Sequence, residues 1–135
     1  CQFCTNPGLI LGIKSPELDA FTAELSSKIV DIEPMCMLHP SIKGAYNSNK
    51  SNVLSQGGVK RLTNPLSVEA NYADQTIATV DGKTFLANPA LHQEVFGPFS
   101  VVVQCEDKAE MMEIIEGLEG QLTGTIIAEK DEIND

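Results

Sequence analysis

The order of apolar runs and helix signals constrains the fold of this chain more than any other feature. Residues 9–13 form a short apolar run that is typical of a buried strand. Ser15, Pro16 and Glu17 follow, and they supply a helix cap, a proline suited to the first turn and an early acid. Apolar side chains then recur at helical spacing, so we expect a helix over residues 16–30.

Two further elements are expected in the middle of the chain. A second helix should start after Pro40 and end at Gly57 and Gly58, because paired glycines favour a helix terminus. Residues 76–80 and 84–87 are rich in β-branched and aromatic side chains, and an Asp-Gly-Lys turn signal separates them. This pattern predicts a hairpin or a tight turn.

The last third of the chain continues the alternation. Residues 100–104 include three consecutive valines, which favours a strand covered on both faces. Asp107 with Glu110 three positions later resembles a capping box and predicts a helix to about Leu118. Residues 123–128 predict another buried strand. Strands alternating with helices predict an α/β fold, with a largely parallel sheet flanked by helices.

Composition excludes several classes of partner. The 135 residues make one domain, and no apolar tract is long enough to cross a bilayer. Nineteen acidic and nine basic side chains give a net charge of −10. Such a surface repels phosphate backbones and anionic membranes, so we expect neither a nucleic acid nor a membrane as partner. Both ends look like cuts through structure, and we expect a piece of a longer protein, truncated at both ends.

The four cysteines indicate a reducing compartment. Their positions are 1, 4, 36 and 105, without the dense pairing of a disulfide framework and without a signal peptide before them. We therefore expect a cytoplasmic protein. Cys36 and Cys105 stand among apolar residues and are expected to be buried, inert thiols.

Cys1 and Cys4 form a Cys-x-x-Cys pattern that has several interpretations. Such a pair can be a dithiol redox centre, half of a zinc site or a structural pair of thiols in a loop. A zinc site needs two more ligands, and the remaining cysteines and the two histidines lack the usual paired spacing, so no metal is expected. A thioredoxin-like motif should follow a strand, whereas here a strand follows the motif.

A resemblance to a known family covers essentially the whole chain. Residues 2–8, QFCTNPG, resemble the active-site cysteine segment of the aldehyde dehydrogenase superfamily, whose pattern is Gly-Gln-x-Cys. Residues 94–98, EVFGP, are similar to the second signature of that family, Glu-x-Phe-Gly-Pro, in the same order and at a comparable gap. Two stretches, residues 3–8 (FCTNPG) in the first motif and residues 85–89 (FLANP) ahead of the second, are most similar to one group within this family. That group is the bacterial NADP-dependent 2,5-dioxovalerate (α-ketoglutarate semialdehyde) dehydrogenases and their fatty-aldehyde relatives.

The resemblance implies a role for five residues. Cys4 matches the catalytic nucleophile, which forms a thiohemiacetal and then a thioester with an aldehyde substrate. Glu94 matches the carboxylate that accepts hydrogen bonds from the nicotinamide ribose of NADP or NAD, and Phe96 matches the ring beside the nicotinamide. Phe3 and Thr5 flank the nucleophile and are expected to touch the substrate.

The resemblance also implies that much of the enzyme lies elsewhere. Residues 1–135 match the central part of a catalytic domain, and the dinucleotide-binding domain, the general base and the oxyanion-binding asparagine belong upstream in the family. We therefore expect the isolated chain to be inactive. The complete protein is expected to be a homo-oligomer, as intact family members usually are.

Cys1 departs from the family pattern, because the family commonly has glycine at that position. A reversible disulfide between Cys1 and Cys4 that switches the enzyme off is one hypothesis, and a harmless replacement is the other. A thiol redox module or a non-catalytic α/β domain stays open as an alternative function. Aldehyde dehydrogenase chemistry needs only Cys4, whereas a dithiol mechanism also needs Cys1.

Overall fold

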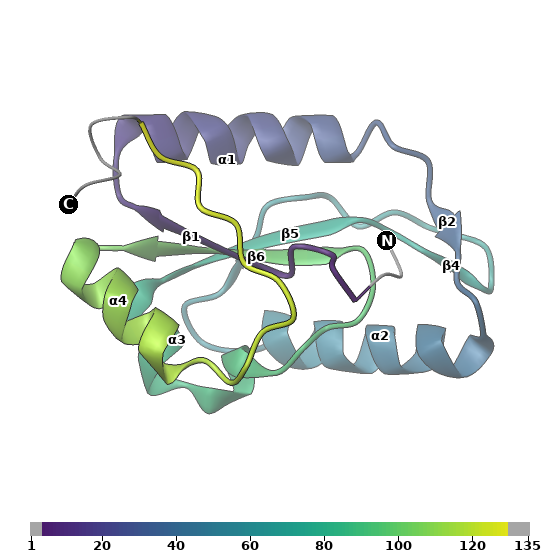
Figure 1. Ribbon diagram of the computed structural model, residues 1–135. Coiled ribbons are helices and arrows are strands. Elements are labelled where there is room, and N and C mark those ends of the chain that lie inside the picture. Colours follow the sequence, from purple (N-terminus) through teal and green to yellow (C-terminus); the bar gives the residue numbers. More distant parts are fainter. Residues whose placement is uncertain (1–3, 130–135) are drawn as a thin grey trace.

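The computed structural model describes residues 4–129 and has a four-stranded sheet at its centre (Figure 1). β1 (Leu9–Ile13) and β5 (Thr76–Asp81) lie on either side of β6 (Phe99–Cys105), and both run parallel to it. β3 (Lys60–Arg61) pairs with β5 in the antiparallel sense, so the order is β1-β6-β5-β3. The expected α/β fold with a largely parallel sheet is confirmed.

The helices cover both faces of this sheet. α1 (Pro16–Ile29) lies on one face, whereas α2 (Pro40–Leu54), α3 (Gly82–Ala87) and α4 (Lys108–Gly117) lie on the other (Figure 1). The remaining elements are a short antiparallel pair, β2 (Met35–Cys36) with β4 (Tyr72–Ala73), and a 3₁₀ helix at Pro89–His92. No helix in residues 4–129 is both long and apolar enough to cross a membrane.

The central strand β6 explains the valine run in the sequence. Val102 and Val103 are both fully buried, because β6 has a strand on each side and helices on both faces. Strands in such a position need apolar side chains on both faces rather than in alternation. The predicted strand at residues 100–104 is therefore confirmed, with one residue more at each end.

Side-chain caps set the starts of α1 and α4, as the sequence indicated. The Ser15 hydroxyl accepts a hydrogen bond from the Leu18 amide at 3.1 Å, and Pro16 occupies the first turn. At α4, the Asp107 carboxylate accepts from the Glu110 amide at 2.9 Å. The Glu110 carboxylate accepts from the backbone amide of Glu106, the residue before the cap, at 2.6 Å, so the arrangement resembles a capping box shifted by one residue.

The hairpin expected at residues 76–80 and 84–87 is wrong. Asp81 does not open a turn but caps a helix: its carboxylate accepts from the Thr84 amide at 2.9 Å and from the Thr84 hydroxyl at 2.7 Å. The chain from Gly82 onward therefore turns into α3. The preceding strand pairs with β6 rather than with the residues that follow it.

The strand expected at residues 123–128 is also wrong, because this segment has no secondary structure. Ile126 and Ile127 are 92% and 95% exposed, so they contribute nothing to the core. A strand needs hydrogen-bond partners on a neighbouring strand, and within residues 4–129 the segment pairs with none. Its β-prone composition is not sufficient without such a neighbour.

Candidate functional site

The cysteine motif leads directly into the first strand. Cys4 and Thr5 are exposed, and they lie in a turn just before β1. Phe3 and Cys1 lie outside the described residues, so the predicted substrate contact of Phe3 and the proposed disulfide stay predictions. An exposed thiol at the end of a strand is open to a small electrophile.

The second motif forms the loop that leads into β6. Glu94 is exposed and Phe96 is half-buried, whereas Val95 and Gly97 are buried. The Glu94 carboxylate therefore faces solvent, whereas the Val95 side chain lies in the core. The side-chain amide of Asn49, on α2, donates to the carbonyl oxygen of Glu94 at 3.4 Å and ties this loop to the helix.

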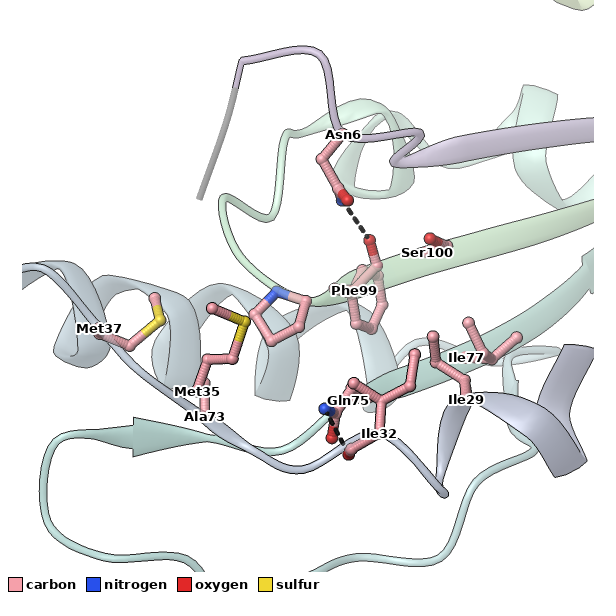
Figure 2. Close-up of a pocket in the computed structure, with 11 residues that line it drawn as sticks. Asn6, Ile29, Ile32, Met35, Met37, Ala73, Gln75, Ile77, Phe99 and Ser100 are labelled. Atoms are coloured by element: carbon pink, nitrogen blue, oxygen red, sulfur yellow. Dashed lines mark hydrogen bonds between the residues drawn. The ribbon is translucent and has the colours of Figure 1, made fainter. Parts of the chain in front are cut away.

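The fold brings the two motifs together. The side-chain amide of Asn6 donates to the carbonyl oxygen of Gly97 at 3.2 Å and to that of Phe99 at 3.5 Å; Figure 2 shows the second of these bonds. The Ser100 hydroxyl also donates to the carbonyl oxygen of Pro7 at 2.7 Å. β1 and β6 are parallel neighbours, and each motif directly precedes its strand. The motifs must therefore meet at the amino ends of the two strands.

An apolar cavity of about 110 Å³ lies behind this junction (Figure 2). Asn6, Pro98 and Phe99 form one side of it, and side chains from the end of α1 and from β2 form the other. Neither Cys4 nor Glu94 lines the cavity, so it is a gap in the packing behind the two motifs, not a pocket in front of the thiol.

A buried group of charges joins α2, β3 and the residue after β4. The Asp74 carboxylate pairs with the Lys50 ammonium at 2.5 Å and with the Arg61 guanidinium at 2.7 Å. Burial acts to raise the pKa of Asp74, but the hydrogen bonds from Lys50 and Arg61 outweigh it and hold that pKa below its ordinary value. Asp74 is therefore a buried anion whose charge is balanced on both oxygens.

The other thiols differ from the sequence expectation in one case. Cys105 is fully buried, and burial raises its pKa to about 11, so it is inert as predicted. Cys36 is exposed, because β2 is a two-residue strand at the margin of the fold; the expectation of a buried thiol is wrong there. Among residues 4–129 no three potential metal ligands come together.

Sequence reasoning missed the residues that hold the two motifs in place. Asn6 is only one letter of the cysteine motif, and Tyr46 is only one apolar residue within the predicted second helix. Asp74 carried no signal, because its partners Lys50 and Arg61 come from other elements of the chain. The one local signal was Asn6, a short polar side chain two positions after the predicted nucleophile Cys4.

No family model matches the chain. Individual proteins do match it, and they are semialdehyde dehydrogenases. It is 36% identical over 132 residues to alpha-ketoglutaric semialdehyde dehydrogenase 2 of Azospirillum brasilense, which is 97% of this chain and 25% of the relative. It is 37% identical over 134 residues to alpha-ketoglutaric semialdehyde dehydrogenase of Acinetobacter baylyi, which is 98% of this chain and 26% of the relative. The chain thus spans about a quarter of the length of these curated relatives.

A solved structure matches the fold as well. The crystal structure of methylmalonate-semialdehyde dehydrogenase from Oceanimonas doudoroffii superposes with a TM-score of 0.71 at 12% sequence identity. The match covers 87% of this chain and 27% of that one. The similarity shows that the sheet and its flanking helices have the arrangement of a segment of that enzyme.

Proposed function

The chain belongs to the aldehyde dehydrogenase family, and we propose that it supplies the catalytic cysteine and part of the nicotinamide site of an enzyme that oxidises an aldehyde to a carboxylate. The observation that carries this proposal is the hydrogen bond between Asn6 and Gly97. It fixes the cysteine segment beside the loop of Glu94 and Phe96, which is the arrangement that a nucleophile and a nicotinamide site require.

The residues of the second motif fit the nicotinamide end of NAD or NADP. The Glu94 side chain is exposed and can accept hydrogen bonds from ribose hydroxyls, and Phe96, two residues later, is half-buried and keeps part of its surface accessible. When bound, the nicotinamide supplies the acceptor for the hydride that leaves the substrate carbon. The rest of a dinucleotide site would have to come from other parts of the protein.

Cys4 performs the covalent steps in this proposal. Its thiolate attacks the aldehyde carbon, and the C–S bond forms as the carbonyl π electrons move to oxygen. Loss of the hydride would leave the acyl group on the Cys4 sulfur as a thioester. Water would then attack the acyl carbon and give up its two protons, one to the general base expected elsewhere in the protein and one to solvent. The C–S bond breaks, the carboxylate departs and the thiolate of Cys4 is restored. Since the Cys4 thiol is exposed, substrate can reach it from solvent.

The names of the relatives suggest the substrate class. Two of them are named for alpha-ketoglutaric semialdehyde, an aldehyde that also carries a carboxylate. We propose a carboxylated aldehyde of this kind for the present protein, with NADP or NAD as the cofactor. The proposal includes a homo-oligomer and a reducing compartment, the cytoplasm, because a thiol nucleophile has to stay reduced.

The test is NAD(P)H formation by the full-length protein that carries this segment. Alpha-ketoglutaric semialdehyde and a long-chain aldehyde are compared, each with NADP and with NAD. Cys4→Ala should abolish turnover, whereas Cys1→Ser should leave it intact. Full activity in Cys4→Ala would disprove the assignment of the nucleophile, and loss of activity in Cys1→Ser would favour a dithiol mechanism.

The 135-residue chain by itself should produce no NAD(P)H under the same conditions. Its described residues include neither a dinucleotide-binding domain nor the general base that the family resemblance puts upstream of the cysteine. Aldehyde-dependent reduction of NADP or NAD by the purified chain would overturn this expectation.

A further inference from the structure

The loop of the second motif rests on one aromatic ring. Gly97 has a φ of +151°, a conformation that L side chains rarely adopt. A Cβ atom at this position would lie 2.4 Å from the Cδ2 atom of Tyr46, so ring and backbone are in close contact. Tyr46 itself is 1% exposed. The Tyr46 ring therefore packs directly against Gly97, whose carbonyl oxygen accepts the hydrogen bond from Asn6.

The hydroxyl of Tyr46 also bonds to this loop. It donates to the carbonyl oxygen of Asp74 at 2.7 Å and lies 3.4 Å from that of Pro98. The Thr76 amide donates to the same Pro98 oxygen at 2.9 Å. The ring and the hydroxyl thus contact two successive residues of the loop, Gly97 and Pro98.

Tyr46 is in turn held by the buried charges. The Lys50 ammonium lies 4.6 Å from the centre of the Tyr46 ring, in the position of a cation–π contact. The same ammonium pairs with the Asp74 side chain at 2.5 Å, and the Asp74 backbone accepts the Tyr46 hydroxyl. Arg61 pairs with the other Asp74 oxygen at 2.7 Å. The ring consequently has contacts on its face and at its hydroxyl that restrict its movement.

We propose that Tyr46 is a positioning residue for the reaction of Cys4. It holds Gly97 and Pro98 where the Asn6 amide can reach the Gly97 carbonyl oxygen, and Asn6 in turn fixes the turn that carries Cys4. Tyr46 touches neither substrate nor cofactor in this proposal. The inference rests on the proposed function, because the position of Cys4 relative to Glu94 matters only if both serve one reaction.

The test is a double-mutant cycle in the full-length protein. Tyr46→Phe removes the hydroxyl and keeps the ring, and Asn6→Ala removes the amide. Each should lower kcat/KM for the aldehyde about tenfold, less than the roughly hundredfold loss that a displacement of a full ångström can cause. The double variant should lose much less than the product of the two effects, because both substitutions release the same loop.

A second readout does not depend on turnover. The rate of Cys4 alkylation by iodoacetamide is followed by mass spectrometry in a Cys1→Ser background. Tyr46→Phe and Asn6→Ala should each change this rate about fivefold, the size expected for one hydrogen bond, and should combine less than multiplicatively. If the wild-type protein does not oxidise aldehydes, the proposed function fails, and the alkylation cycle then decides only whether Tyr46 positions the Cys4 thiol.

Ile114→Val is the matched control. Ile114 is 1% exposed like Tyr46, but it lies on α4, away from both motifs. This variant should lower Tm without a change in the Cys4 alkylation rate. Combined with Asn6→Ala, it should therefore give the same alkylation rate as Asn6→Ala alone. Fully multiplicative effects of Tyr46→Phe and Asn6→Ala, in kcat/KM or in alkylation where turnover is absent, would overturn the proposal.

Discussion

The side-chain amide of Asn6 lies 3.2 Å from the carbonyl oxygen of Gly97, a contact between residues 91 positions apart in the sequence. Asn6 follows Cys4 by two positions, and Gly97 directly follows Phe96. One hydrogen bond therefore joins a loop with an exposed thiol to a loop with an exposed carboxylate. The parallel pairing of β1 with β6 makes the contact possible, because it places both loops at the same end of the sheet.

Gly97→Ala should destabilise the protein by about 2 kcal/mol, because an added Cβ meets the Tyr46 ring and the φ of +151° is unfavourable for alanine. The Tyr46 ring is buried and held by hydrogen bonds, so it cannot move aside easily. The measurement is the free energy of unfolding in urea. An unchanged value would contradict the close contact between ring and backbone.

Gly44→Ala is the matched control for that prediction. Gly44 lies within α2, and a Cβ there would meet nothing within 4 Å. Alanine should raise the stability by up to about 1 kcal/mol, since glycine is the poorer helix former. A loss of stability in this variant would mean that the environment of α2 differs from the one described.

Asp74→Asn should be among the more damaging single substitutions. It leaves the Lys50 ammonium and the Arg61 guanidinium without the carboxylate that balances them, and the Asp74 side chain is only 7% exposed. Loss of one partner from a buried pair typically costs about 3 kcal/mol. Chemical denaturation of wild type and variant at pH 7 gives the difference, and a change near zero would contradict the role of the pairs.

The pH dependence of stability should follow from the same carboxylate. The pKa of Asp74 is lowered on folding, so its stabilising effect is complete above the unfolded value of about 3.8 and is lost as the pH falls through the lower folded value. Wild type should therefore lose stability in acid more steeply than Asp74→Asn. Parallel unfolding curves for the two proteins between pH 5 and pH 2 would show that Asp74 does not contribute.

Thiol labelling should distinguish the cysteines. Cys4 and Cys36 are exposed, whereas Cys105 is fully buried with a pKa raised to about 11. Iodoacetamide at pH 8 should modify Cys4 and Cys36 in the folded protein, and Cys105 only after denaturation. Mass spectrometry of the peptides gives the order. Rapid labelling of Cys105 in the native state would contradict its burial.

Local signals predicted those elements that carry their own caps and periodicity. The helix at Pro16–Ile29 matches the expected 16–30 within one residue, because Ser15 and Pro16 determine its start. The sequence after Asp81 was misinterpreted because a capping aspartate and a turn aspartate look alike before glycine. Its assignment depends on Thr84, which returns two hydrogen bonds to the same carboxylate.

Residues 123–128 show where local signals fail to predict structure. Their composition favours a strand, but a strand is a property of two segments, and within residues 4–129 no neighbour pairs with them. The same dependence on distant neighbours explains which site residues the sequence predicts. Cys4 and Glu94 could be identified from motifs. The contribution of Tyr46 and Asp74 to the second motif depends on contacts between elements far apart in sequence, which no local pattern reveals.

The contact between Gly97 and Tyr46 has a consequence for how this sequence can diverge. Position 97 has no room for a side chain while an aromatic ring occupies position 46, and its φ of +151° disfavours a side chain even without that ring. A smaller residue at position 46 would remove the clash but not the backbone strain, so glycine should persist at position 97 whatever residue occupies position 46. The loop position is therefore constrained by its own backbone as well as by its neighbour on the helix.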